Sequence, residues 1–437
     1  MNPIQEIVRE QKAGNPIGIY SCCSSNEKVI RAVLQRGKRN DTVVLVESTA
    51  NQVDQFGGYS GMRPADFYAF VHGIANEEGF DTDKLILGGD HLGPLTFSNE
   101  PEGAAMEKAA ELVRQYAAAG FTKIHLDTSM RVADDPTDVP LPDETIARRS
   151  ALLCRVAEDA VVKRKKANPD TESPVYVIGS EVPIPGGAQE AEDSVSVTKP
   201  EAAKTTIEVF RRSFAAQGLD DTWRRVVGLV VQLGVEFGDA QVVEYNREAA
   251  KNLTDILKDY QNMVFEGHST DYQTAQHLKE MVEDGVAILK VGPGLTFALR
   301  EGLLSLEAIE RELLTGTGAP LSDLRNVMDH AMLSQPSNWQ KHYHGNGVEQ
   351  RFARIYSYSD RVRYYLNMDT VKLATDRLMD NLSAVQIPQT LLSQYMPIQY
   401  DRVRAGTLEF EPKALLFDHI GDCIDLYLHA TRQLKQM

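Results

Sequence analysis

The feature that most constrains the fold is an alternation of short apolar runs with longer amphipathic segments, repeated eight times between about residue 15 and residue 316. The runs are rich in β-branched and aliphatic residues, and the segments carry apolar residues at helical spacing, so the pattern predicts β-then-α units. The predicted strands are Ile17–Ser21, Val43–Ser48, Lys84–Asp90, Lys123–Thr128, Val175–Glu181, Val226–Gly234, Met263–His268 and Ala287–Gly292. Parallel strands joined by crossover helices make a closed (β/α)8 TIM barrel the natural architecture.

An open doubly wound sheet is the alternative, but no GxGxxG opens a first βα turn. Beyond Gly316 the chain shows helical segments with many tyrosines and no further credible strand. We therefore predict a (β/α)8 barrel over residues 1–316. A helical C-terminal extension over residues 317–437 is expected to pack on the barrel instead of forming a separate functional domain.

Composition excludes several classes of partner and location. The chain has 62 acidic and 46 basic residues and a formal net charge of −16, which repels polyanions, so nucleic acid is not an expected partner. No apolar run reaches the roughly 18 residues that cross a membrane, and the charged start lacks the apolar core of a signal peptide. We expect a cytoplasmic protein, and in that compartment its four cysteines are expected to be reduced. None of the four shows a metal-binding spacing.

Polar side chains stand at or near the carboxyl ends of the predicted strands, where a (β/α)8 barrel forms its active site. They are Glu47, Asp90, His91, Asp127, Glu181, Gln232, Glu236, Glu266, His268 and Lys290. Burying so many ionisable groups is costly unless they pair with one another, bind a metal or meet a polar substrate.

Several of these residues also have structural interpretations. Glu47 could cap the next segment or form a salt bridge to Lys290 across the barrel, and a Schiff-base role for Lys290 has no supporting motif. His125 shares a strand face with Asp127 but favours a core position. His91 and His268 are stronger ligand candidates, because each lies beside an acid in a strand-end loop and two histidines with a carboxylate suit Zn²⁺ or Mn²⁺.

The loops after the seventh and eighth strands offer a candidate phosphate site, with Ser269 and Thr270 in one and Gly292, Gly294 and Thr296 in the other. The second loop runs directly into a predicted helix, whose backbone N–H groups and dipole favour an anion. A glycine turn before a helix is also common as simple punctuation. No GxxxxGK[ST] is present, so we expect no nucleotide cofactor and no kinase activity.

Long stretches of the chain resemble the Z subunits of D-tagatose-1,6-bisphosphate aldolase, the GatZ/KbaZ-like family. The matching stretches are STANQVDQFGGY at 48–59, GGDHLGP at 88–94, HLDTSM at 125–130, GSEVPIPGG at 179–187, QLGVEF at 232–237, FEGHSTDYQ at 265–273 and LKVGPGLTFALRE at 289–301. The resemblance implies a TIM barrel, a role in galactitol or N-acetylgalactosamine catabolism, and support of a separate zinc-dependent class II catalytic subunit acting on a sugar phosphate.

A more distant similarity to the catalytic class II aldolases bears on the metal. Asp90-His91 matches their Asp-His pair after strand three, in which the histidine binds zinc and the aspartate transfers a proton. After strand six their His-Gly is replaced by Phe237-Gly238, and after strand seven this chain has Glu266-Gly267-His268-Ser269. The three-histidine zinc site therefore does not carry over.

Two hypotheses remain at this point. In one, the site has decayed and the chain is a supporting subunit built on an enzyme fold, with a homo-oligomer also possible. In the other, carboxylates have rebuilt a metal site for retro-aldol cleavage or 4-epimerisation of a ketose or ketose phosphate. The residues assigned to catalysis are Asp90, Asp127 and Glu181; to metal, His91, Glu181, Glu266 and His268; to substrate or phosphate, Glu47, Gln232, Ser269, Thr270, Lys290, Gly292, Gly294 and Thr296.

Overall fold

Eight parallel strands close into a barrel in the structure, which is a computed structural model and describes residues 2–182 and 195–434. The strands are β1 Ile19–Cys23, β2 Val44–Thr49, β3 Leu85–Leu92, β4 Lys123–Leu126, β5 Val175–Ile178, β6 Val226–Val230, β9 Val264–Gly267 and β10 Val286–Val291. Their order around the barrel is β1-β10-β9-β6-β5-β4-β3-β2. The predicted (β/α)8 barrel is confirmed.

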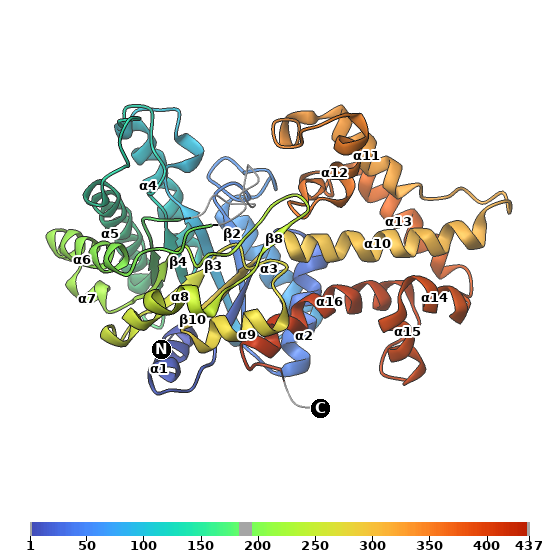
Figure 1. Cartoon of the computed structure of the whole chain (residues 1–437), viewed down its shortest axis with the longest axis horizontal. Helices are drawn as coiled ribbons and strands as arrows, with labels where there is room; N and C mark the ends of the chain where they lie inside the picture. Colours follow the sequence, from blue (N-terminus) through green and yellow to red (C-terminus); the bar gives the residue numbers. More distant parts are fainter. Residues whose placement is uncertain (1, 183–194, 435–437) are drawn as a thin grey trace.

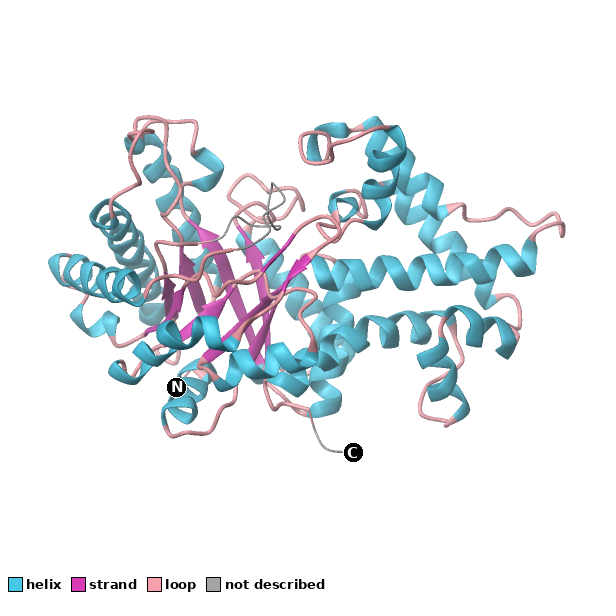
Figure 2. Cartoon of the chain, viewed as in Figure 1, coloured by secondary structure: helices cyan, strands magenta, loops and turns pink. Residues whose placement is uncertain are grey.

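Helices surround this barrel, as Figure 2 shows. They are α2 Glu27–Asn40, α3 Pro64–Glu78, α4 Glu102–Ala119, α5 Asp143–Ala167, α6 Pro200–Ala216, α7 Asp220–Trp223, α8 Arg247–Thr254, α9 Ala275–Glu283 and α10 Pro293–Leu314. Short 3-10 turns are η1 Thr82–Lys84, η2 Leu95–Phe97 and η3 Asp255–Asp259. These helices lie between the strands, where the sequence pattern predicts amphipathic segments, and their apolar stripes pack against the outer face of the strands.

The fifth and sixth strands are shorter than predicted. β5 ends at Ile178 and β6 at Val230, so Glu181 and Gln232 lie in loops beyond the strands. An antiparallel pair that the pattern did not predict, β7 Glu236–Phe237 and β8 Val242–Val243, follows β6. Residues 183–187 of the GSEVPIPGG stretch lie outside the described residues.

Inward-facing residues change from apolar to charged along the barrel axis. Near the amino ends of the strands, Leu45, Val264 and Ile288 form an interior cluster that the N-terminal helix α1 (Pro3–Lys12) covers with Ile4 and Ile7. Because side chains alternate in a strand, the next inward position after each of these is two residues on. Those positions in β2, β9 and β10 hold Glu47, Glu266 and Lys290, which begin the polar half of the barrel.

After α10 the chain forms helices only, in the part that the structure describes. They are α11 Leu324–Ser334, η4 Pro336–Asn338, α12 Gly347–Tyr356, η5 Arg361–Tyr364, α13 Asp369–Ser383, α14 Gln389–Tyr395, α15 Pro397–Arg404 and α16 Pro412–Ala430. Figure 1 shows α10 projecting away from the barrel and α16 running back beside it. The last helix contacts α2, α9 and β1, and Asp418 of α16 pairs with buried Arg36 of α2 at 3.0 Å. The division at residue 316 stays a prediction.

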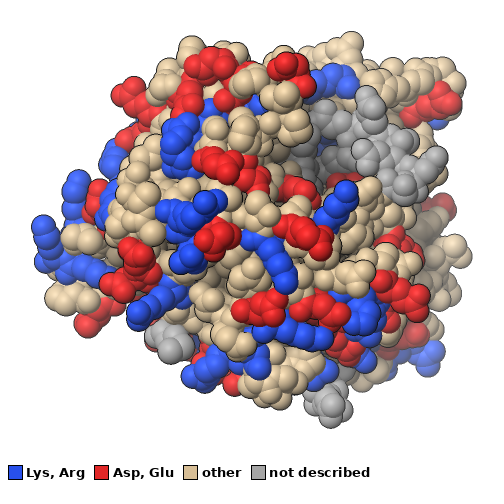
Figure 3. All heavy atoms as spheres, turned by 60° about the vertical axis from the view of Figure 1, so that its left-hand side comes forward, with Lys and Arg blue, Asp and Glu red and all other residues tan. Residues whose placement is uncertain are grey.

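The surface carries both signs of charge. On the face shown in Figure 3, Lys and Arg side chains are interspersed with Asp and Glu. Salt bridges between the two signs include the Arg211–Glu208 pair of α6 and the Arg225–Glu158 pair. Among the helices of residues 2–182 and 195–434, none combines the length and the apolar character needed to cross a membrane.

Candidate active site

A fully buried lysine forms salt bridges with two carboxylates in the charged half of the barrel. Lys123, the first residue of β4, has no exposed surface, and its Nζ lies 2.7 Å from Glu47 Oε1 and 2.6 Å from Glu266 Oε2. Glu47 also accepts a hydrogen bond of 2.6 Å from the Ser21 hydroxyl. Gly88 faces Glu47 from β3, and a Cβ there would lie 2.6 Å from Glu47 Cγ, so a larger residue would displace the carboxylate.

Lys290 links this layer to the mouth of the barrel. Its Nζ lies 3.0 Å from Glu47 Oε2, 3.0 Å from Asp90 Oδ1 and 3.9 Å from Glu266 Oε1. The salt bridge between Glu47 and Lys290, one of the structural interpretations left open for Glu47, is therefore present. Burial disfavours the ammonium, but the charges of Asp90 and the neighbouring groups outweigh it and raise the pKa of Lys290 well above its usual value. An amine held charged in this way is a poor Schiff-base nucleophile.

Three imidazole rings lie close together in this polar half of the barrel. The ring centroids lie 5.2 Å apart for His91 and His125, 4.9 Å for His91 and His268, and 5.2 Å for His125 and His268. Each ring is held by its own carboxylate: His125 Nδ1 lies 2.9 Å from Asp90, His91 Nδ1 lies 2.7 Å from Asp127, and His268 Nε2 lies 3.0 Å from Glu266. His125, expected in the core, thus belongs to the site.

Burial and neighbouring charges shift the pKa values of these groups in different directions. Burial lowers the pKa of His268 to about 4, so its ring is neutral at pH 7 and able to bind a metal. Burial also opposes the charge on His91, but Asp90 and Asp127 outweigh it and raise the pKa of His91. Against burial, which would raise them, neighbouring cations and histidines lower the pKa values of Asp90, Asp127 and Glu266.

The donor set fits a divalent cation. Ligand atoms of Asp90, His125, Glu266 and His268 lie within 4.8 Å of one another, and all four residues are buried. His125 Nε2 is buried and has no hydrogen-bond partner among the described residues. Two imidazoles and two carboxylates suit Zn²⁺ or Mn²⁺.

This set differs from the predicted ligands His91, Glu181, Glu266 and His268. His91 is turned towards Asp127, whose other oxygen accepts hydrogen bonds from the backbone N–H and hydroxyl of Ser129. Glu181 is exposed, accepts a hydrogen bond from Thr198 and lines a small separate pocket with Ser180 and Thr206. Its expected position in the central pocket is wrong, because β5 ends three residues earlier and leaves Glu181 on a loop.

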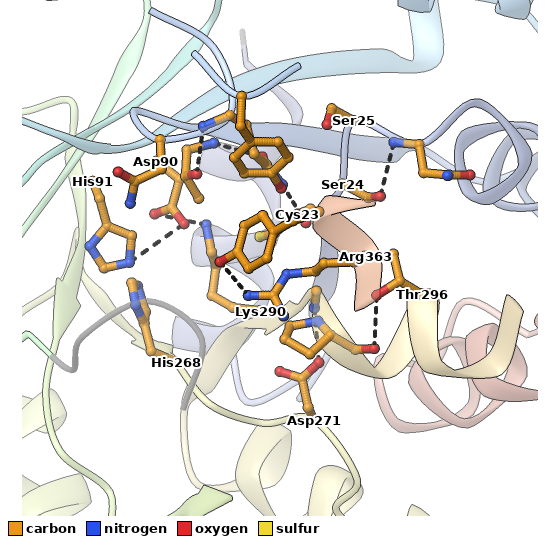
Figure 4. Close-up of a pocket in the computed structure, with 18 of the residues that line it drawn as sticks. Cys23, Ser24, Ser25, Asp90, His91, His268, Asp271, Lys290, Thr296 and Arg363 are labelled. Carbon is orange, nitrogen blue, oxygen red and sulfur yellow. Dashed lines mark hydrogen bonds and ion pairs between the residues drawn. The ribbon is translucent and has the colours of Figure 1, made fainter. Parts of the chain in front are cut away.

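The open pocket above the cluster is built from strand-end loops and from the C-terminal extension. Figure 4 shows Asp90, His91, His268 and Lys290 at one side and Arg363, Thr296 and Asp271 at the other. His91 and Ser269, both at the pocket wall, have φ values of 50° and 53°, a left-handed conformation that non-glycine residues rarely adopt. Such strained positions cluster at functional sites.

An internal carboxylate occupies the predicted phosphate cradle. Asp271 Oδ1 accepts hydrogen bonds from the backbone N–H groups of Gly292, at 2.9 Å, and Gly294, at 2.7 Å, where α10 begins. Ser269, Gly292 and Thr296 line the pocket as expected. The Thr270 hydroxyl donates to the Lys290 carbonyl instead, and the Gln232 side chain accepts from Gly234 and Val235 in its own loop.

We expect Asp271→Asn to flatten the pH dependence of stability between about pH 4 and 6. Burial raises the pKa of Asp271 to about 6 against an ordinary value near 4. In that window the folded protein keeps a proton that the unfolded chain has released, so the free energy of unfolding falls as pH rises, by up to about 3 kcal/mol. Denaturant unfolding at several pH values measures this, with exposed Asp401→Asn as the control; equal slopes for wild type and Asp271→Asn would contradict it.

Comparison with known proteins identifies the family. A family model described as D-tagatose-1,6-bisphosphate aldolase subunit GatZ/KbaZ-like matches residues 4–432. The chain belongs to this family. The described parts of the stretches that resemble GatZ/KbaZ-like proteins supply the buried cluster, including Asp90 and His91 of GGDHLGP, His125 of HLDTSM, and Glu266 and His268 of FEGHSTDYQ.

Solved structures give two further likenesses. A protein described as a probable tagatose 6 phosphate kinase from Sinorhizobium meliloti 1021 shares 45% sequence identity with a TM-score of 0.86, and the match covers 94% of this chain and 100% of that one. A fructose-bisphosphate aldolase from Campylobacter jejuni shares 15% identity with a TM-score of 0.46, over 87% of this GatZ/KbaZ-like chain and 91% of the other. The second likeness is too weak to carry an argument about function.

Proposed function

We propose that this chain is a supporting subunit of D-tagatose-1,6-bisphosphate aldolase, which raises the activity and stability of a separate class II catalytic subunit. The match to the GatZ/KbaZ-like family over residues 4–432 carries the proposal. Tagatose phosphates from galactitol or N-acetylgalactosamine catabolism would be the substrates of the assembly. A cytoplasmic location and a homo-oligomer stay predictions.

The test is a cleavage assay on tagatose 1,6-bisphosphate with the chain alone, a cognate class II subunit alone and the two together. We expect no turnover by this chain alone, and a higher rate or a longer half-life for the catalytic subunit in its presence. His268→Ala should leave this stimulation largely intact, because surface packing and not pocket chemistry produces it. Loss of stimulation in this variant, with the fold retained, would contradict a purely supporting role.

The buried Asp90, His125, Glu266 and His268 cluster favours a second candidate, a metal-dependent ketose-phosphate aldolase or 4-epimerase that acts alone. A Zn²⁺ or Mn²⁺ ion held by these four residues would polarise a ketose carbonyl when bound. His91, oriented by Asp127 and with a pKa that Asp90 and Asp127 raise, stands beside them as the candidate proton donor. Metal analysis of the purified chain, together with solo assays on tagatose and fructose phosphates, distinguishes the two candidates.

Kinase activity is not part of the proposal, although the Sinorhizobium meliloti relative carries that description. The sequence has no GxxxxGK[ST] motif. The backbone N–H groups of Gly292 and Gly294, which would suit a phosphate, already donate to Asp271.

A further inference from the structure

An arginine from the C-terminal extension lines the pocket without a carboxylate partner. Arg363 belongs to η5, about 70 residues after β10, and lies at the pocket wall with Tyr364 and Asn367. Its Nη1 donates to the carbonyl oxygens of Ser359 and, at 3.1 Å, Asp360, and its Nη2 donates to the Tyr364 hydroxyl at 2.8 Å. Figure 4 shows its side chain reaching into the pocket.

Arg363 forms no salt bridge with any carboxylate in the described part of the chain. No carboxylate there lies within 4.0 Å of its guanidinium, whereas Lys290 in the same pocket has three carboxylate neighbours. The adjacent Asp360 carboxylate is engaged elsewhere, 3.0 Å from Arg300 Nε and 2.6 Å from the Thr296 hydroxyl. A guanidinium has five N–H donors, and the three neutral contacts leave donors for an oxyanion.

The segment that carries Arg363 is fastened to the barrel. Arg300 and Asp360, which join α10 to η5, are both buried. The hydroxyls of Ser357 and Ser359 donate to Asp239 at 2.7 and 2.9 Å, and Tyr272 donates to the Tyr358 carbonyl at 2.6 Å. Arg363 is therefore held in place before a ligand arrives, which lowers the entropic cost of binding.

The backbone N–H groups at the start of a helix often bind an anion in a (β/α)8 barrel, but here they already have a partner. The N–H groups at the start of α10 already bind the Asp271 carboxylate, so a phosphate would have to displace an internal anion to use them. Asp271 itself forms no salt bridge with Arg363, although the charge of Arg363 favours the ionised form of its carboxyl group. Because Gly292 and Gly294 already bind Asp271 and Arg363 has no salt-bridge partner, we expect a negatively charged group of a ligand to bind at Arg363 in the C-terminal extension.

We propose that Arg363 binds the phosphate group of a sugar phosphate whose other end faces Asp90, His268 and Lys290. The inference takes its ligand class from the proposed function and deepens it by naming the residue that recognises the phosphate. A planar guanidinium suits phosphate because it donates parallel hydrogen bonds to two oxygens. The extension is then part of the binding site and not only a cap on the barrel.

The experiment is a calorimetric titration of the full-length chain with fructose 6-phosphate, fructose, inorganic phosphate and a hexonate as the carboxylate probe. Arg363→Ala is compared with Arg363→Lys and with Arg351→Ala, an exposed arginine of α12 away from the pocket. We expect Arg363→Ala to raise the Kd for fructose 6-phosphate about 10- to 100-fold, the range for losing charge-assisted hydrogen bonds, and Arg363→Lys to have a smaller effect. The Kd for fructose should not change, and Arg351→Ala should resemble wild type.

Several outcomes would overturn the inference: equal losses for fructose 6-phosphate and fructose, an unchanged Kd in Arg363→Ala, tighter binding of the hexonate than of the phosphate ester, or no binding of fructose 6-phosphate by wild type. Circular dichroism monitors the fold, and Arg363→Lys replaces Arg363→Ala if the latter unfolds. Because the titration uses this chain alone, its failure leaves the stimulation assay untouched, and each proposal can fail separately.

Discussion

Lys123→Met is expected to lower the free energy of unfolding by about 3–5 kcal/mol, the usual cost of removing one partner from a buried ion pair. Lys123 has no exposed surface and lies between the equally buried Glu47 and Glu266, at 2.7 and 2.6 Å. Methionine preserves most of the side-chain volume but removes the charge between the two carboxylates. Among the described lysines and arginines, only Lys290 then remains within 4.0 Å of Glu47 and Glu266.

Denaturant unfolding followed by circular dichroism measures this effect. Lys163→Met, at an exposed position of α5, is the matched control and should change stability by less than about 0.5 kcal/mol. Adding Glu47→Gln to Lys123→Met should recover part of the loss, because it removes one of the two stranded charges. A loss below about 1 kcal/mol in Lys123→Met would show that the buried pairs are not the main support of the barrel centre.

Any turnover of a ketose phosphate by this chain alone is expected to fall about 10²- to 10⁴-fold in Asp90→Asn, the range for losing a general acid or base. Asp90 faces both the His125 ring, at 2.9 Å, and Lys290 Nζ, at 3.0 Å. The neutral amide cannot accept a proton as the carboxylate does, and it is a weaker metal ligand. Stimulation of a class II subunit should be little affected by the same substitution.

Solo turnover, stimulation and bound metal are measured on the same preparations, with Asp376→Asn at an exposed position of α13 as the control. Solo turnover that Asp90→Asn abolishes would replace the supporting-subunit proposal with the aldolase or 4-epimerase alternative. Solo turnover that survives Asp90→Asn would contradict the assignment of Asp90 as a catalytic residue.

The barrel could be predicted from the sequence because its signals are local. Alternation of period two and period 3.6 within short windows identifies strands and helices, and eight β-then-α units leave few ways to arrange parallel strands. The same alternation predicted that His125 and Asp127 share one face of the predicted strand Lys123–Thr128, and Lys123 stands on that face two residues before His125. Reading that face as a polar series, instead of residue by residue, would have placed Lys123 and His125 in the site.

Other site residues carried no local signal. Glu181 lies on a loop outside the central pocket, because the exact end of β5 depends on pairing with β4 and β6 and not on the apolar pattern of β5 itself. The sequence pattern could not predict that Asp271 binds the N–H groups of Gly292 and Gly294, since these contacts join residues about 20 positions apart.

The sequence by itself determined the strand order and the concentration of polar residues at the carboxyl ends of the strands, because both follow from periodicity and the connectivity of parallel strands. Only the tertiary structure decided which polar groups pair, which atoms remain for a metal and which cation faces the pocket unpaired. Arg363 shows the reason: it reaches the pocket through Asp360 and Arg300, a buried pair 60 residues apart in the chain, and such long-range contacts leave no mark in a local pattern.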